Sequence, residues 1–379
     1  MNAADARTTD IVVFGHHEPK GGIQRYFANM IKEWIADGYT VEVVNFRDGE
    51  LFYPQELEHL VSCVHLGVRN KFVAAFKLWK HLFKNQPKVI ISTAHLDNKI
   101  VSYLNYFPGI KSQRFVSVHN TYGKSGRRDP SGLARKVEEI KKLYKLNHGV
   151  IAVSEGIQAD LQENVGLKDV PVHVIWNGAI TRETLERSRE SVDHPWLSDT
   201  QGVPVLVTAG GLRQQKDHRT LIDSFAEVRS RKDCRLIVLG EGPLRDELEE
   251  RAQEQGVAAD VDLYGFVDNP YAWMAKADCF VLSSLWEGLP TVLIEALSLG
   301  VPIVSTDCPS GPREILQNGK YGKLVPMSDI EALADAIERT LSGEVENFDP
   351  RKAVEPFTAR YASQLYLEVF GLLEKGEST

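Results

Sequence analysis

The 379-residue sequence lacks the features that mark several classes of protein. Its four cysteines are scattered, and no two have the spacing of a metal site or a redox pair. No apolar run approaches the roughly 18 residues that cross a bilayer, and the polar first ten residues do not resemble a signal peptide. We therefore expect a reduced, cytoplasmic compartment. We expect no metal or other cofactor, because no cluster of His, Cys or acidic residues has metal-ligand spacing.

Charge is distributed unevenly along the chain. The net charge of −8 divides into +5 over residues 1–180 and −13 over residues 181–379. The apolar fraction of 43% is that of an ordinary globular protein. It indicates that the two halves meet different partners.

Apolar strand patterns alternate with helix-like stretches in both halves. The strand patterns cover 10–15, 40–46, 88–93, 113–119, 149–154, 173–178, 204–210, 234–240, 261–266, 278–284 and 302–306. This alternation predicts an α/β fold of two tandem, doubly wound, Rossmann-like domains that face a cleft. The predicted parts are a first domain over 1–180, a connection over 181–202, a second domain over 203–358 and a closing helix over 359–379. Ligands of such sheets bind beyond the carboxyl ends of the strands, which makes the cleft the default site.

Two acids stand out in the apolar segment 286–306. Glu287 precedes a predicted helix that has Pro290 in its first turn and ends at Gly300, and Glu295 lies about one and a half turns into it. The free amides at the start of this helix suit an anion such as phosphate. Carboxylates beside such a site can accept hydrogen bonds from sugar hydroxyls. Taken alone, the two acids could equally cap and solvate a helix.

The motif EGLPTVLIEAL at 287–297 resembles the two-glutamate signature of retaining glycosyltransferases with the GT-B fold, sequence family four (group 1). Segments 206–222, 236–249, 263–290 and 310–316 follow in the order and spacing of that family, so the resemblance covers nearly the whole chain. It implies transfer of a sugar from a nucleotide diphosphate, UDP by family frequency, to a hydroxyl acceptor. A lipid-linked or cell-surface glycan would be such an acceptor, and the front-face mechanism implied is one without metal.

The resemblance also assigns donor-binding residues. It places Glu287 on the donor sugar, Glu295 on the ribose and Lys216 on the diphosphate, where a cation neutralises the leaving group. The family's Gly-Arg-Leu reads Gly-Gly-Leu at 210–212, so Arg213 is the candidate to replace the missing arginine. The other donor-binding candidates are Gly240, Glu241, Phe266, Val267, Gly288, Leu289, Pro290 and Thr291.

In the first half, the Gly21–Gly22 pair follows the first strand and opens a helix. The resemblance puts this turn over the donor phosphate and the acceptor. It also puts His119, at the end of the strand over 113–119, against the transferred sugar. The predicted catalytic set is therefore His119, Lys216 and Glu287.

Other interpretations stay open. A nucleotide-sugar epimerase uses a similar fold, and a non-catalytic protein could bind a sugar nucleotide without turning it over. The triplet Asp260-Val261-Asp262 resembles a metal motif of other glycosyltransferases, but it opens a strand and should point away from the cleft. No nucleic-acid partner is indicated.

A basic, aromatic segment at 69–88 has six Lys or Arg residues and no acid. Phe72, Phe76, Trp79 and Phe83 recur in it at helical spacing, which is typical of a helix lying on an anionic membrane. Residues 123–136 add further basic groups. The alternative is an ordinary helix on the sheet with a solvated basic face. On the first interpretation the protein is peripheral on the inner face of the membrane.

Overall fold

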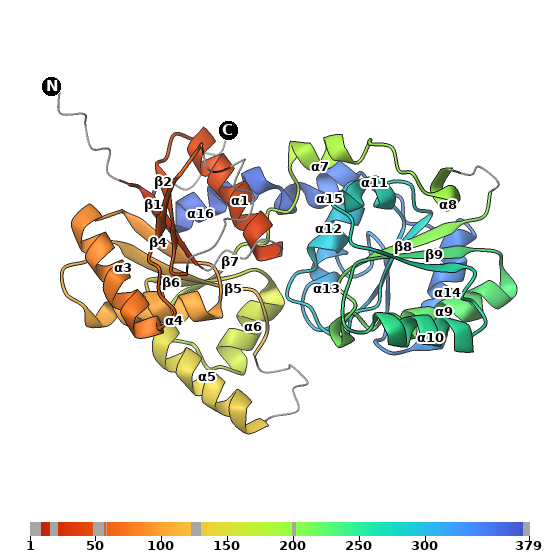
Figure 1. Cartoon of the computed structure of the whole chain (residues 1–379), viewed down its shortest axis with the longest axis horizontal. Coiled ribbons are helices and arrows are strands. Elements are labelled where there is room, and N and C mark those ends of the chain that lie inside the picture. The colour runs from red at the N-terminus through yellow and green to blue at the C-terminus, as the bar shows by residue number, and fades with distance from the viewer. Residues whose placement is uncertain are drawn as a thin grey trace. The chain divides into compact units, whose positions relative to one another are not determined.

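The computed structural model describes residues 9–15, 22–47, 57, 59–122, 130–198 and 202–373. The chain divides into two compact units, one formed by residues 1–178 with 358–379 and the other by residues 179–357 (Figure 1). Each unit is built on a twisted parallel sheet flanked by helices. The predicted fold class of two Rossmann-like, doubly wound domains is confirmed.

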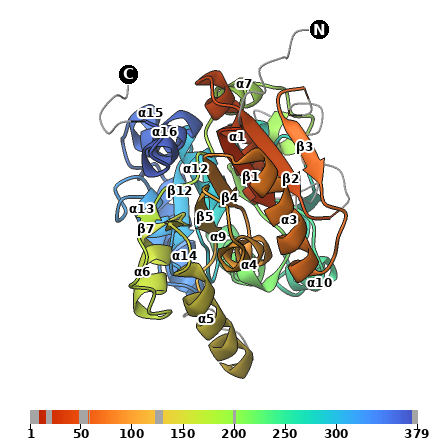
Figure 2. The same cartoon turned by 90° about the vertical axis from the view of Figure 1, so that its left-hand side faces the viewer.

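The first unit contains a seven-stranded sheet in the order β3-β2-β1-β4-β5-β6-β7, with every described pair parallel. Its strands are β1 (Ile11–Gly15), β2 (Val41–Asn45), β3 (Ser62–His65), β4 (Val89–Ser92), β5 (Gln113–Val118), β6 (Gly149–Ala152) and β7 (Val172–Val174). Its helices are α1 (Gly22–Ala36), α3 (Lys71–Asn85), α4 (His95–Tyr103), η1 (Leu104–Tyr106), α5 (Pro130–Tyr144), α6 (Glu155–Glu163) and α16 (Ala359–Val369). Figure 2 shows α5 projecting beyond the other helices of this unit.

The C-terminal helix α16 completes the core of the first unit. Tyr366 of α16 and Phe370, its C-cap, pack on Trp34 of α1, and all three side chains are fully buried. Arg360 at the start of α16 pairs with Asp37 just after α1. Burial of each of these aromatic side chains contributes on the order of 2 kcal/mol. Residues 1–178 alone would leave the Trp34 side chain without the cover that Tyr366 and Phe370 provide.

The second unit contains a six-stranded parallel sheet in the order β10-β9-β8-β11-β12-β13. Its strands are β8 (Val205–Ala209), β9 (Arg235–Leu239), β10 (Val261–Gly265), β11 (Cys279–Leu282), β12 (Ile303–Thr306) and β13 (Lys323–Val325). Its helices are α7 (Arg182–Arg187), α8 (Pro195–Ser198), η2 (Gln214–Lys216), α9 (His218–Arg231), α10 (Arg245–Glu254), α11 (Pro270–Met274), α12 (Thr291–Ser298), α13 (Pro312–Ile315), α14 (Ile330–Leu341), α15 (Pro350–Val354) and η3 (Glu355–Phe357).

Both sheets reverse their strand order once, between β1 and β4 in the first unit and between β8 and β11 in the second. Loops diverge at such a switch point, and ligands of doubly wound sheets bind there, beyond the carboxyl ends of the strands. The loops after β8 and β11 contain Lys216 and Glu287, so the topology brings these two predicted residues to one place. Among the described residues, no helix is both long enough and apolar enough to span a bilayer.

Candidate functional site

The loops that follow β8 and β11 are joined by hydrogen bonds at the switch point of the second sheet. The backbone N–H of Leu285 donates to the carbonyl of Gln215 (2.8 Å), and the Ser283 hydroxyl donates to the carbonyl of Lys216 (2.7 Å). These bonds hold the single turn η2 against the strand end. They fix where the side chains of both loops can reach.

Lys216 and Glu287 form a close ion pair in this site. The lysine Nζ lies 2.7 Å from Glu287 Oε1, and their side chains are only 18% and 8% exposed. The Ser284 hydroxyl donates to the same carboxylate oxygen (2.6 Å), and the Gln215 amide donates to the other (3.3 Å). Sequence reasoning placed both residues at the donor site but missed that they pair. It also missed Gln215 and Ser284, which hold the carboxylate.

The helix α12 begins at Thr291, four residues after Glu287. Gly300, in the left-handed region at φ +70°, follows its C-terminal end, as the sequence predicted. Pro290 is its N-cap and makes no side-chain hydrogen bond to the first amides. Glu295 is buried on the helix. The Leu293 amide donates to the Pro290 carbonyl (3.0 Å), and the amides of Thr291 and Val292, which precede it, are suited to an anion.

The segment before α12 is braced by the loop after β12. The Ser310 hydroxyl donates to the carbonyl of Gly288 (2.7 Å), and Leu289 is buried. Gly311, at φ +94°, packs so closely on Pro290 that a side chain there would collide with the proline ring. The backbone of 288–291 is therefore held from outside the helix, as a preorganised anion site requires.

The turns after β8, β9 and β10 form one backbone assembly. Leu212 donates its N–H to the carbonyl of Glu241 (3.0 Å), and Gly240 donates to the carbonyl of Gly265 (2.8 Å). Gly240 has φ +146°, and an added Cβ would collide with the carbonyl oxygen of Gly210, so glycine is required there. The Glu241 carboxylate is engaged by Arg245 (2.9 Å).

Phe266 and Val267 follow β10 in the loop expected to line a base pocket. The Phe266 side chain is 59% exposed, and Val267 is half-buried. Burial of apolar surface is the normal state of a phenylalanine, and an exposed aromatic ring is a surface on which a planar ligand can stack.

Arg213 lies over the glycine that replaces the family's arginine. Its Nε is 3.6 Å from the point where a Cβ on Gly211 would sit, and its side chain is exposed. Arg213 forms no ion pair with any described residue, whereas Lys216 is engaged by Glu287. The Arg213 guanidinium can therefore supply positive charge close to the position where an arginine at 211 would begin its side chain.

His119 directly follows β5 in the first unit. Its Nε2 lies 2.8 Å from the Ser117 hydroxyl, and the rings of Tyr26 and Phe27 pack edge-on against it. Desolvation lowers the pKa of His119 to about 3, so the imidazole is neutral at physiological pH. It can contribute a hydrogen bond to a ligand but no charge. The Gly21–Gly22 turn was expected to lie near the donor phosphate. Gly22 begins α1, and Gly21 lies outside the described residues.

The triplet at 260–262 is engaged by protein cations and imidazole. The carboxylate of Asp260, just before β10, pairs with Arg229 (2.8 Å), and that of Asp262 lies 3.1 Å from His194 Nε2. Within the part of the chain that the structure describes, no three His, Cys, Asp or Glu side chains gather as metal ligands do.

Two family profiles match consecutive parts of the chain. "Glycosyltransferase Family 4" matches residues 20–183 and "Glycosyl transferases group 1" matches residues 203–343, so together they cover well over half of it. The two Rossmann-like units are those of a GT-B fold. The chain belongs to the group 1, family-four-like glycosyltransferases.

Named relatives agree with this assignment. An N-acetylgalactosamine-N,N'-diacetylbacillosaminyl-diphospho-undecaprenol 4-alpha-N-acetylgalactosaminyltransferase of Campylobacter jejuni is 30% identical over 54% of this chain and 54% of its own. An uncharacterised glycosyltransferase of Methanocaldococcus jannaschii is 45% identical over 30% of this chain. The chain thus spans about half of the length of the Campylobacter relative and 28% of the length of the Methanocaldococcus relative. Anabaena HepE in complex with UDP and glucose has the same fold, with a TM-score of 0.76 at 18% identity over 96% of this chain and 100% of that one.

Proposed function

We propose that the protein transfers a sugar from a nucleoside diphosphate, UDP in the first instance, to a hydroxyl acceptor on a lipid-linked glycan, with retention of the anomeric configuration. The observation that carries this proposal is the buried Lys216–Glu287 pair, whose glutamate lies in the loop before α12. Pro290, the N-cap residue of that helix, makes no side-chain capping bond. The UDP seen in HepE and the diphospho-undecaprenol acceptor in the name of the Campylobacter enzyme support the choice of donor and acceptor.

The proposed reaction forms a bond between the acceptor oxygen and the sugar's anomeric carbon and breaks the bond from that carbon to the diphosphate. The acceptor proton passes to the leaving phosphate oxygen on the same face. Lys216, Arg213 and the amides of α12 stabilise the negative charge on the leaving group. Glu287 accepts hydrogen bonds from donor hydroxyls, and neutral His119 offers one hydrogen bond to the transferred sugar.

UDP alone should stabilise the protein, and a chelator should not abolish the effect. At about 100 times Kd, binding contributes about 2.7 kcal/mol to stability, which corresponds to a rise in Tm on the order of 5 °C. Thermal-shift measurements with UDP, in the presence and absence of EDTA, test this expectation. Stabilisation that appears only with added divalent cation would contradict the proposed site.

Incubation with a UDP-sugar separates the candidate activities. A glycosyltransferase given donor without acceptor should return unchanged donor or slow hydrolysis, whereas an epimerase should yield the epimer. With acceptor present, the anomeric proton coupling of the product reports whether the configuration is retained.

We also propose that the outer face of α3 binds an anionic membrane surface. Ala74, Ala75, Leu78 and Leu82 are its buried face. Its aromatic face, which we define as Phe72, Phe76, Trp79 and Phe83 with Phe107 beyond η1, points outward, with Phe72, Phe76 and Phe83 more than half exposed. Solvent exposure of such large apolar groups together is costly, and an anionic lipid surface would cover them.

The cations around this face are of two kinds. Lys77 donates to the carbonyl of Leu66 (2.7 Å) and Lys88 pairs with Asp10 (2.8 Å), so both are engaged within the protein. Lys80, Lys84 and Lys111 are exposed and make no ion pair with any described residue. The second basic segment, 123–136, lies mostly outside the described residues; its last part is the start of α5.

Charge reversal of Lys80, Lys84 and Lys111 to glutamate should abolish binding to vesicles that contain phosphatidylglycerol. Each basic group near such a surface contributes about 1 kcal/mol, and salt screens that attraction. Co-sedimentation with anionic and with neutral vesicles measures the effect. The control is the same reversal at Lys141, Lys142 and Lys145 in and just after α5, which changes the net charge equally. Binding that survives reversal beside α3 and high salt would show that this face is not the contact.

A further inference from the structure

The segment expected to be only a connection is docked along an edge strand of the second unit. β10 lies at the edge of its sheet. The buried His194 contacts Asp262 of β10 (3.1 Å) and packs its ring on Tyr264 of that strand and on Trp273 of α11. Covering an edge strand protects its unpaired backbone groups. The connecting segment also contacts residues that follow the end of β10.

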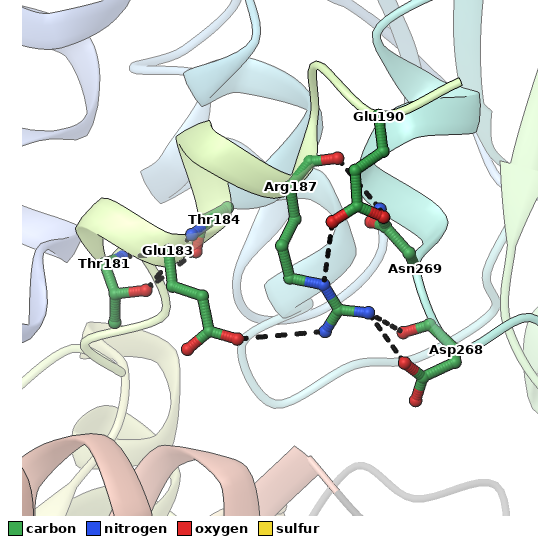
Figure 3. A network of polar contacts seen from close by, with 7 residues as sticks. All are labelled: Thr181, Glu183, Thr184, Arg187, Glu190, Asp268 and Asn269. Atoms are coloured by element: carbon green, nitrogen blue, oxygen red, sulfur yellow. Dashed lines mark hydrogen bonds and ion pairs between the residues drawn. The ribbon is translucent and has the colours of Figure 1, made fainter. Parts of the chain in front are cut away.

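Arg187, the last residue of α7, reaches the loop that follows β10 (Figure 3). Its Nη2 donates to the Asp268 carboxylate (2.7 Å) and to the Asp268 backbone carbonyl (3.3 Å). A contact with the carbonyl fixes the backbone of the loop, which a contact with the side chain alone would not do.

The loop after β10 also donates hydrogen bonds to the end of α7 and the residues after it. The Asn269 amide donates to the Arg187 carbonyl (2.8 Å) and to the Glu190 carboxylate (2.7 Å). Glu183 and Glu190 each lie 3.9 Å from the Arg187 guanidinium and complete the network of Figure 3. We call this reciprocal set of bonds, centred on Arg187, Asp268 and Asn269, the α7 clamp.

The helix that presents Arg187 is itself held at its start. Thr181 and Thr184 form a capping box, which stabilises a helix of six residues that would be marginal alone. The Asp268 side chain is 87% exposed, so its ion pair with Arg187 adds little to global stability. The α7 clamp therefore controls the position of the loop more than the stability of the fold.

We infer that Arg187 is a positioning residue for the nucleotide base. The clamped residues Asp268 and Asn269 directly follow Phe266 and Val267. The exposed ring of Phe266 is the proposed stacking surface, so the clamp sets the position of that ring and of Val267. The inference rests on the proposed function, because it takes the loop after β10 to face the base. It adds a residue, 79 positions before Phe266, to the determinants of donor choice.

The test compares Arg187→Ala with Arg182→Ala. Arg182 lies on the same helix and pairs only with Glu186 among described residues, so its loss controls for changes in α7 itself. Kd values for UDP, GDP and ADP are measured by calorimetry for the wild type and both variants. Arg187→Ala should weaken the preferred nucleotide about 5- to 10-fold, change the others less than twofold, and leave Tm within about 2 °C. Arg187→Lys keeps the charge but loses the planar guanidinium. Its Kd for the preferred nucleotide should lie between those of the wild type and Arg187→Ala.

The outcomes distinguish an error in the role of the α7 clamp from an error in the proposed function. Unchanged discrimination between the three nucleotides in Arg187→Ala, whether affinity stays the same or falls uniformly, would overturn the role of the α7 clamp and leave the proposed function standing. A wild-type protein that binds none of the three would overturn the proposed function and this inference with it. In turnover, the expected signature is a higher KM for donor at unchanged kcat.

Discussion

Glu287→Ala is expected to lower kcat for sugar transfer by about 10³-fold while UDP binds as tightly as before or more tightly. The carboxylate is held by Lys216, Ser284 and Gln215 in a nearly dry site, where a preorganised group contributes on the order of 3–4 kcal/mol to a transition state. Its loss also frees the Lys216 ammonium from a partner that competes with the diphosphate. Steady-state kinetics and UDP calorimetry on the same sample measure both effects.

Glu295→Ala provides the matched comparison on α12. Glu295 is proposed to bind the ribose, so its loss should raise Kd for UDP and the KM for donor, with a smaller effect on kcat. Glu287→Gln, which keeps the shape and can still accept from Ser284, should retain more activity than Glu287→Ala. Identical kinetic defects in the two alanine variants would show that the division between sugar and ribose is incorrect.

Lys216→Ala is expected to abolish UDP-induced stabilisation and to destabilise the unliganded protein. The change leaves Glu287 buried without its cation, and the loss of one partner of a buried pair costs about 3 kcal/mol. Loss of nucleotide binding could therefore reflect unfolding alone, and denaturant titration of the apo protein measures that component directly.

The double variant Lys216→Met/Glu287→Gln separates the two effects. It removes both charges and keeps similar side-chain volumes, so stability should recover most of the loss. UDP binding should stay lost, because the diphosphate still lacks its cation. A double variant that regains UDP-dependent stabilisation would show that Lys216 serves the fold and not the ligand.

The strand–helix alternation was predictable because buried parallel strands are short apolar runs that glycine-rich turns interrupt. The elements missed are those without that pattern. β3 is partly exposed and begins with a polar residue, and β13 has three residues. α7 is short and polar, and α8 has only four residues. Short helices of this kind are stabilised by caps and tertiary contacts, which leave no periodic signal in the sequence.

Motif and position were enough to propose candidate site residues, but not the contacts between them. Lys216 and Glu287 lie 71 residues apart, and the bond from Leu285 to Gln215 brings them together. The expected donor residues around 240, 266 and 288 are described, but their contact with a donor stays a prediction. The α7 clamp was invisible in the sequence, since Arg187 sits in a polar segment where any cation could have been solvated.

The chain returns to the first unit only with α16, and this has a consequence during synthesis. The second unit is a continuous segment, 179–357, which is complete as soon as its last residue leaves the ribosome. The first unit begins first but finishes last, because the cover over Trp34 is supplied by Tyr366 and Phe370. The nascent protein therefore carries an open apolar surface on its first-made unit until α16 and Phe370 have been synthesised.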